Sequence, residues 1–191
     1  MGLRTETEMA AFQGIRINAE RCTGCRICES ICAFNKHDEF NPKRSRIRIV
    51  KMERFFLDVP VVCQQCPEPS CVAECPVGAL KKGEDHVVHV EEDLCTGCER
   101  CIDACPFRGI SIDPISNVAI ICDLCRGAPE CVQWCPTRAI ELGPPQRPSN
   151  SVSSTAQSLL RKWGIPEKEY EEYFLKFQDR KIKQKFLKFG T

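Results

Sequence analysis

Long apolar segments are absent from this chain of 191 residues. Its most hydrophobic stretches are residues 55–62, which Asp58 and Pro60 interrupt, and residues 118–121. A helix that crosses a bilayer needs about 20 apolar residues, so we expect no membrane span. Residues 1–8 are polar and acidic, without the apolar centre of a signal peptide or a twin-arginine pair. The sequence therefore predicts a cytoplasmic protein, unless it is exported in complex with a partner that carries the signal.

Motifs of the common enzyme classes are also missing. The chain has no P-loop, no GxGxxG fingerprint and no recognisable Ser/His/Asp arrangement. It contains three histidines, and for His86 and His89 we prefer a surface or packing role over metal ligation. Lysines and arginines are dispersed, without an RNA-binding signature. We therefore expect no reaction on this chain and no nucleic-acid partner.

Cysteine, in contrast, is abundant: sixteen residues, which fall into four groups of four. Quartet one is Cys22, Cys25, Cys28 and Cys32; quartet two is Cys63, Cys66, Cys71 and Cys75; quartet three is Cys95, Cys98, Cys101 and Cys105; quartet four is Cys122, Cys125, Cys131 and Cys135. So much cysteine in a short secreted chain would indicate a disulfide scaffold. Clustered cysteines without an export signal favour metal binding instead.

The spacing within quartet three identifies the metal group. It reads C-x2-C-x2-C-x3-C-P, the ferredoxin run for a [4Fe–4S] cluster in which the fourth cysteine ligates a neighbouring cluster. Quartet one has the same spacing but carries Ala33 in place of the proline. Quartets two and four have longer middle spacers with Pro67, Pro69 and Pro129, which cannot be helical. Structural zinc, held by two pairs of cysteines, is the alternative.

The quartets form an internal repeat. Short and long middle spacers alternate, and residues 76–80 (PVGAL) resemble residues 136–140 (PTRAI). Four [4Fe–4S] clusters would use all sixteen cysteines. Duplication by itself could pair quartet one with quartet two, so the spacing leaves the pairing open. Metal binding would supply folding free energy, and we expect the metal-free chain to be largely unfolded. Four clusters would also change the formal net charge from +1 to about −7.

Short strands and helices are expected between the quartets, which predicts an α+β fold. Hairpins are indicated over residues 77–90 and 107–121, and a short strand around Ile15 and Ile17. Residues 44–50 alternate with period two, which indicates a half-buried strand with a basic outer face. That face could dock an acidic partner or could simply be solvated. Glycines Gly24, Gly97 and Gly127 are expected to aim backbone N–H groups at cluster sulfurs. Apolar residues beside the ligands are expected to exclude water, namely Ile27, Ile31, Val72, Ile102 and Val132.

We divide the chain into a four-cluster domain over residues 14–142, a Pro/Ser-rich linker over 143–153 and a C-terminal helical tail over 154–191. One helix is expected over residues 154–163, and a second from Glu167 onward. An apolar face of the second helix could pack on the protein's own core or dock on another subunit. That face comprises Leu175, Ile182, Phe186 and Phe189, widened by Tyr170, Tyr173, Phe174 and Phe177.

With four quartets in this order, residues 14–142 resemble the four-cluster iron–sulfur subunits of molybdenum and tungsten oxidoreductases, the dimethyl-sulfoxide-reductase beta-subunit type. Residues 22–28 (CTGCRIC), 40–48 (FNPKRSRIR) and the compact 122–131 (CDLCRGAPEC) are similar to the small subunits that accompany tungsten aldehyde oxidoreductases and tungsten benzoyl-CoA reductases. Polyferredoxins of carbon monoxide dehydrogenase and hydrogenase are also similar.

This resemblance implies two interleaved ferredoxin-like modules, in which quartet one pairs with quartet four and quartet two with quartet three. The implied ligand sets are Cys22, Cys25, Cys28 and Cys135; Cys122, Cys125, Cys131 and Cys32; Cys63, Cys66, Cys71 and Cys105; and Cys95, Cys98, Cys101 and Cys75. It further implies an electron-transfer subunit in a hetero-oligomer, between a catalytic tungsten- or molybdenum-pterin subunit and a flavin or ferredoxin exchange partner. A free polyferredoxin and a zinc-binding interaction protein remain alternatives.

Overall fold

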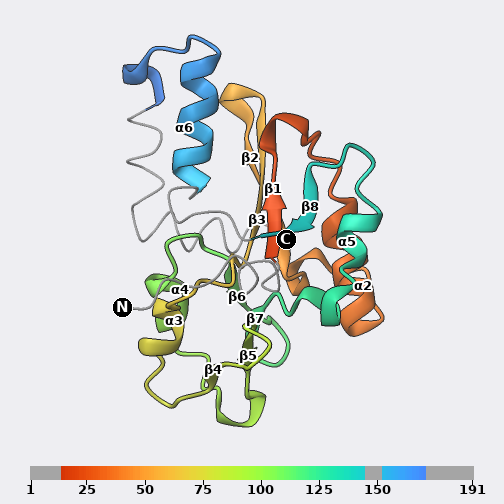
Figure 1. Ribbon diagram of the computed structural model, residues 1–191, viewed down its shortest axis with the longest axis vertical. Coiled ribbons are helices and arrows are strands. Elements are labelled where there is room, and N and C mark those ends of the chain that lie inside the picture. The colour runs from red at the N-terminus through yellow and green to blue at the C-terminus, as the bar shows by residue number, and fades with distance from the viewer. Residues whose placement is uncertain (1–13, 145–151, 171–191) are drawn as a thin grey trace.

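The computed structural model describes residues 14–144 and 152–170, in which short helices alternate with two-stranded antiparallel sheets (Figure 1). The α+β class is therefore confirmed. The strands are β1 Gly14–Ile17, β2 Ile47–Met52, β3 Leu57–Val62, β4 Leu80–Lys82, β5 Val88–Val90, β6 Ile110–Ile112, β7 Ala119–Ile121 and β8 Ile140–Gly143. The α-helices are α2 Ile27–His37, α3 Ser70–Ala73, α4 Arg100–Ala104, α5 Glu130–Gln133 and α6 Val152–Lys162.

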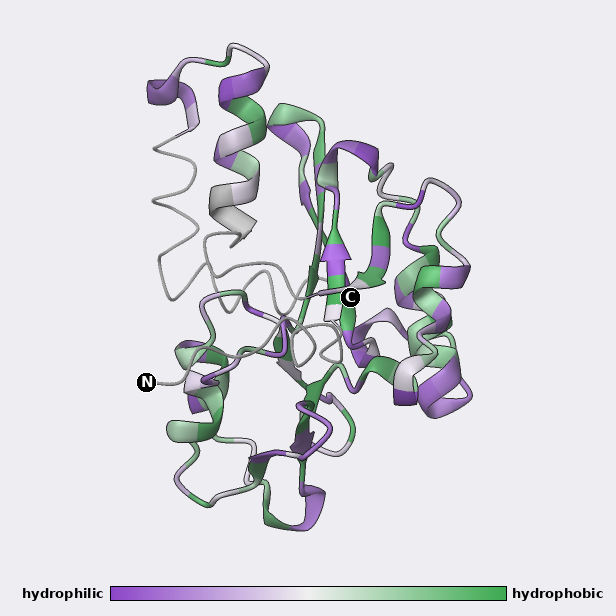
Figure 2. Cartoon of the chain, in the orientation of Figure 1, coloured by the Kyte–Doolittle hydropathy of each residue, from purple (hydrophilic) through white to green (hydrophobic). Residues whose placement is uncertain are grey.

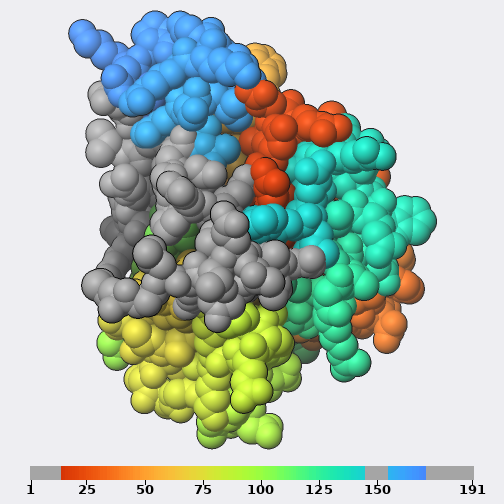
Figure 3. Space-filling view, in the orientation of Figure 1, coloured from red at the N-terminus to blue at the C-terminus, as the bar shows by residue number. Residues whose placement is uncertain are grey.

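The first and last parts of the cysteine-rich region lie side by side. Strand β1 pairs antiparallel with β8, so that Ile15 lies opposite Leu142 and Ile17 opposite Ile140. Helix α2 packs against α5, and Asn35 donates a hydrogen bond of 2.7 Å to Glu130. In the space-filling view, the segment that carries quartet four covers the segment that carries quartet one (Figure 3). The fold thus joins two regions that are far apart in the sequence.

The middle of the chain forms the other half of the molecule. Strand β4 pairs with β5 and β6 with β7, as the predicted hairpins require. Helix α3 packs on α4, and β5 contacts β7. Apolar residues follow the strands toward the centre, and hydrophilic residues gather in the outer turns (Figure 2). Ile110 and Ile121, which lie opposite each other in the β6–β7 pair, are nearly inaccessible to solvent.

The β2–β3 hairpin corrects one expectation. Residues 44–50 were predicted to present a basic outer face, either for docking or to solvent, but their arginines are only partly exposed and turn toward the rest of the chain. Arg44 pairs with Asp113 of the β6–β7 turn, and Arg46 pairs with Asp123 beside quartet four. Arg48 donates to the carbonyl oxygens of residues 108 and 110. The positive side chains therefore cross-link the hairpin to the cysteine loops.

A second apolar core holds the start of the C-terminal region. Helix α6 begins at Val152, two residues before the expected start, and packs against β3. Leu160 and Tyr170 are fully buried in a cluster with Met52 and Leu57 of the hairpin. Helical backbone resumes at Glu167, as predicted. The described part of the tail therefore packs on the protein's own core, whereas Tyr173, Phe174, Leu175, Phe177, Ile182, Phe186 and Phe189 lie outside the described residues.

Within residues 14–144 and 152–170, no helix has the length and apolarity that a bilayer crossing requires.

Candidate iron–sulfur cluster sites

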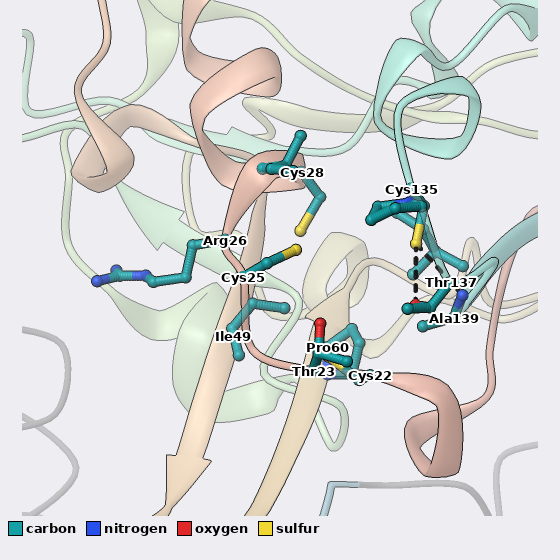
Figure 4. A pocket seen from close by; sticks show the side chains of 13 residues that line it. Cys22, Thr23, Cys25, Arg26, Cys28, Ile49, Pro60, Cys135, Thr137 and Ala139 are labelled. Atoms are coloured by element: carbon teal, nitrogen blue, oxygen red, sulfur yellow. Dashed lines mark hydrogen bonds between the residues drawn. The ribbon is translucent and has the colours of Figure 1, made fainter.

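Four cysteines from opposite ends of the cysteine-rich region share one cavity. Cys22, Cys25 and Cys28 of quartet one line it together with Cys135, the last cysteine of quartet four. The sulfurs of Cys25, Cys28 and Cys135 point into the same space (Figure 4). The lining also includes apolar groups of Ile49, Pro60, Ala139 and Ile140. The β1–β8 pairing and the packing of α2 on α5 create this arrangement, which spacing within the sequence could not specify.

The loops that carry the first three cysteines of quartets one and three share an unusual backbone. Gly24 (φ +63°) and Arg26 (φ +62°) are left-handed in quartet one, as are Gly97 (φ +67°) and Glu99 (φ +63°) in quartet three. Left-handed residues in such loops turn consecutive N–H groups inward and form an anion-binding concavity. The repeat seen in the sequence therefore encodes a repeated loop shape.

In quartet three, the residue that precedes the second cysteine must be glycine. A Cβ atom on Gly97 would lie 2.4 Å from the backbone oxygen of Asn117, well inside van der Waals contact. The left-handed φ adds strain for any residue with a Cβ. Gly24 N–H also donates to the Cys22 thiolate and acts to lower its pKa, although burial raises that pKa overall. The contact of Gly24 agrees with the role expected of that glycine.

The last cysteines of quartets two and four lie in matching nests of backbone N–H groups. Burial acts to raise the pKa of Cys75, but N–H groups from residues 77–80 outweigh it, so its pKa is lowered. At Cys135 burial is likewise outweighed by backbone donors of residues 140, 139 and 137 and by the Thr137 hydroxyl, which lower the pKa of that thiol. Ala139 N lies 3.2 Å from the Cys135 sulfur. The matching PVGAL and PTRAI segments therefore build donors that stabilise a thiolate.

The remaining cysteines also gather across quartets. Cys66 and Cys71 lie near enough to Cys105 that its charge acts on their pKa values. The charge of Cys32 acts in the same way on the pKa values of Cys125 and Cys131. Within quartet three, the charges of Cys95 and Cys98 act on the pKa of Cys101. Cys75 follows α3, which packs on α4, and the neighbouring Glu74 pairs with Arg100 at 3.3 Å.

The donor set fits a cationic iron–sulfur group. All sixteen cysteines are free thiols. Burial raises the pKa of Cys28, Cys71 and Cys122 to about 12, and that of Cys101 to about 11. Thiolates so poorly solvated need a bound cation, and coordination to a metal deprotonates a thiol outright. These pockets therefore suit thiolates that are bound to iron.

Among the described residues, no group of three or more His, Cys, Asp or Glu side chains could hold a single metal ion. That finding does not bear on a cubane, because each thiolate then binds a different iron and the sulfurs lie farther apart than around one zinc ion.

Comparison with known proteins identifies the domain type. Residues 54–144 match the family model described as a 4Fe-4S dicluster domain, and residues 19–35 match a 4Fe-4S binding domain. The chain contains [4Fe–4S] ferredoxin-type domains. The expected cofactor is thereby confirmed, and sixteen cysteines fit four clusters.

Several curated relatives are named as subunits of reductases or oxidoreductases. The B subunit of the anaerobic dimethyl sulfoxide reductase of Escherichia coli is 34% identical over 113 residues, which cover 52% of this chain and 54% of that protein. The polyferredoxin-like subunit of aliphatic sulfonate oxidoreductase from Pyrococcus furiosus is 39% identical over 93 residues, which cover 48% of this chain and 53% of that protein. The match thus spans about half the length of these relatives.

Among solved structures, the chain is similar to one in the active-site complex BamBC of benzoyl coenzyme A reductase with benzoyl-CoA. The two are 29% identical, the TM-score is 0.42, and the match covers 78% of this chain and 89% of that chain.

Interpretation of the sequence alone overlooks or misjudges several residues at these sites. Gln65, between two cysteines of quartet two, is fully buried and links separate loops. No local pattern in the sequence marks it, because its partners come from quartet four and strand β5. Ile27 was expected to exclude water beside the ligands but is 38% exposed. Val72, Ile102 and Val132 are packed partly buried against the main core.

Proposed function

We propose that this chain is an electron-transfer subunit that carries four [4Fe–4S] clusters and performs no catalysis of its own. The observation that carries this proposal is the shared cavity of Cys22, Cys25, Cys28 and Cys135, which joins thiols from the two ends of the cysteine-rich region. A cluster ligated only by thiolates takes up and releases single electrons and offers no open position to a substrate.

In this proposal residues 14–142 form two interleaved ferredoxin-like modules. One holds clusters on Cys22, Cys25, Cys28 and Cys135, and on Cys122, Cys125, Cys131 and Cys32; the other holds clusters on Cys63, Cys66, Cys71 and Cys105, and on Cys95, Cys98, Cys101 and Cys75. The pairing of β1 with β8 and the packing of α3 on α4 support this division. The nests around Cys75 and Cys135 support the role of the fourth cysteine in each set.

The protein's own groups would control how readily each cluster accepts an electron. Backbone N–H groups lie 3.2–3.5 Å from cysteine sulfurs, at Cys135 from Ala139, at Cys32 from Arg46 and at Cys63 from Gln65. Hydrogen bonds to thiolate sulfur stabilise the more negative, reduced form and raise the reduction potential, whereas burial lowers it.

The partner we propose is a catalytic tungsten- or molybdenum-pterin subunit, with a flavin protein or ferredoxin at the other end of the chain of clusters. The named relatives, which include the B subunit of a reductase and a polyferredoxin-like subunit of an oxidoreductase, support a hetero-oligomer. We further propose that the complex works in the cytoplasm. A free polyferredoxin for hydrogenase is a second candidate, favoured by the match to hydrogenase-4 component A of Escherichia coli, 34% identical over 90 residues.

Anaerobic purification of the full-length protein tests the proposal. We expect a brown protein with about sixteen iron and sixteen sulfide per molecule, which is reduced by dithionite and reoxidised reversibly. A colourless protein that contains a few zinc ions would contradict it. Co-purification with a pterin-containing subunit supports the subunit role, and isolation as a single reducible protein favours the free polyferredoxin.

A further inference from the structure

The two proposed cluster modules meet around Cys63 and Cys122. Both cysteines are buried, with 6% and 7% of their surface exposed. Cys122 belongs to the module of quartets one and four, and Cys63 to the module of quartets two and three. They lie close enough that the charge of Cys122 acts on the Cys63 thiol. A Cβ atom on Gly109 would be 2.5 Å from the Cys63 backbone nitrogen, so the loop after quartet three is also tightly packed here.

A single buried side chain spans this meeting point. Gln65 has no exposed surface, and its side-chain Nε2 donates to the carbonyl oxygen of Cys122 at 2.5 Å. Its Oε1 accepts from the Val88 N–H of strand β5 at 2.9 Å, and its backbone N–H donates to the Cys63 sulfur at 3.5 Å. Gln65 is therefore hydrogen-bonded to a cysteine of each module at the same time.

The chemistry of this position calls for a primary amide. The side chain must donate in one direction and accept in the other, and both partners are backbone groups that would otherwise be buried without a hydrogen bond. The residue is also held at φ +49°, a left-handed conformation that is uncommon for a residue with a Cβ atom. Such strain persists only where the surroundings fix it.

We propose that Gln65 is a positioning residue that fixes the junction where electrons cross between the two modules. This inference rests on the proposed function, since it requires clusters at Cys63 and Cys122. Electron transfer between the two clusters moves one electron and breaks no bond, and its rate falls steeply with the gap between the ligands. By tying the Cys122 carbonyl to the loop of Cys63, Gln65 keeps that gap short and constant.

Gln65→Met tests the proposal in the holoprotein, because methionine keeps the length of the side chain and removes both hydrogen bonds. Gln64→Met is the matched control. Gln64 is also buried beside Cys63, but its amide donates to the nearby Val62 carbonyl, two residues earlier in the chain. A photoreductant delivers less than one electron per molecule, and samples frozen at successive times are followed by electron paramagnetic resonance. The fully reduced spectra report the magnetic interaction between clusters.

We expect both variants to keep wild-type iron and sulfide. In Gln65→Met, redistribution of the electron should slow severalfold, and the inter-cluster interaction should weaken. Gln64→Met should match the wild type. An unchanged rate and spectrum in a fully loaded Gln65→Met would overturn the proposal.

If Gln65→Met does not assemble its clusters, Gln65→Asn takes its place, since it keeps the amide but is one methylene shorter. Slow redistribution in a loaded Gln65→Asn supports the proposal, and wild-type redistribution refutes it. Failure of the proposed function is distinguishable, because the wild-type protein itself would then lack the four clusters.

Discussion

Arg44 and the buried Asp113 form an ion pair that joins the two halves of the cysteine-rich region. The Arg44 Nη2 lies 2.7 Å from the Asp113 Oδ2, and the Arg44 Nε lies 3.0 Å from the same oxygen. Only 3% of the Asp113 side chain is exposed. Arg44 precedes the β2–β3 hairpin and Asp113 lies in the β6–β7 turn, so the pair ties the hairpin to the loop that connects quartets three and four.

Arg44→Met should destabilise the holoprotein more than Asp113→Asn. The first change leaves a buried carboxylate with the Ile115 N–H but without its cation, whereas the second leaves Arg44 paired with Glu39. Thermal unfolding and the rate of cluster loss to a chelator measure both effects. Lys81→Met serves as the control, because its pair with Glu91 is exposed and should contribute little. Equal effects of Arg44→Met and Lys81→Met would contradict this interpretation.

The same pair should make stability depend on pH. Burial acts to raise the pKa of Asp113, but hydrogen bonds from Arg44 and the Ile115 N–H outweigh it, so the folded-state pKa is lowered. Its stabilisation should be fully present above the unfolded pKa of about 4 and be lost as the pH falls through the lower folded pKa. The difference between wild type and Asp113→Asn should therefore be constant at neutral pH and shrink in acid. If the stability difference between wild type and Asp113→Asn grew in acid, the folded-state pKa of Asp113 would be raised and the prediction would be wrong.

Gly97→Ala should destabilise the cluster loop more than Gly78→Ala. Both glycines are left-handed, which costs an alanine about 1–2 kcal/mol. A Cβ on Gly78 meets nothing within 4 Å, whereas a Cβ on Gly97 meets the backbone oxygen of Asn117 at 2.4 Å. The midpoint temperature of thermal unfolding should be clearly lower for the Gly97→Ala holoprotein than for the Gly78→Ala holoprotein. Equal midpoints would show that the turn at Asn117 can shift to accept the Cβ atom without loss of stability.

Serine substitutions should reveal which cysteines share a cluster. If the proposed ligand sets are right, Cys25→Ser and Cys135→Ser alter the same signal in electron paramagnetic resonance, although the residues belong to quartets one and four. Cys131→Ser should alter a different signal, although it is in the same quartet as Cys135. Should Cys135→Ser and Cys131→Ser affect one common signal, each quartet would hold its own cluster and the interleaved arrangement would be wrong.

Deletion of residues 171–191 should leave the clusters and the stability intact and weaken association with the partner. The apolar face predicted for this segment is the reason to expect docking. Deletion from residue 164 should also lower stability, because it removes Tyr170, which is fully buried against Leu160 and Met52. Iron content, thermal unfolding and co-purification distinguish these effects. Co-purification that is unchanged by the shorter deletion would exclude the docking role.

Much of this protein is determined by the sequence alone. The cysteine quartets specify the cluster type, because each loop that wraps a [4Fe–4S] cluster is local and its spacing is set by the length of the turn. The PVGAL and PTRAI segments likewise specify their N–H nests, since the donors of each nest lie within five residues of the cysteine that they surround. The hairpins predicted over residues 77–90 and 107–121 are present as β4–β5 and β6–β7, with shorter strands than predicted.

Only the tertiary structure decided which quartets meet. The placement of Cys135 beside Cys22 depends on the pairing of β1 with β8, a contact between distant segments that no local pattern encodes. The same holds for Arg44, Arg46 and Arg48. Alternation predicted a strand over residues 44–50, but β2 begins at Ile47, so that of these three arginines it contains Arg48 alone. Whether that face meets water or other loops depends on what packs against it. The bridging role of Gln65 is invisible in the sequence for the same reason, because its partners come from quartet four and strand β5.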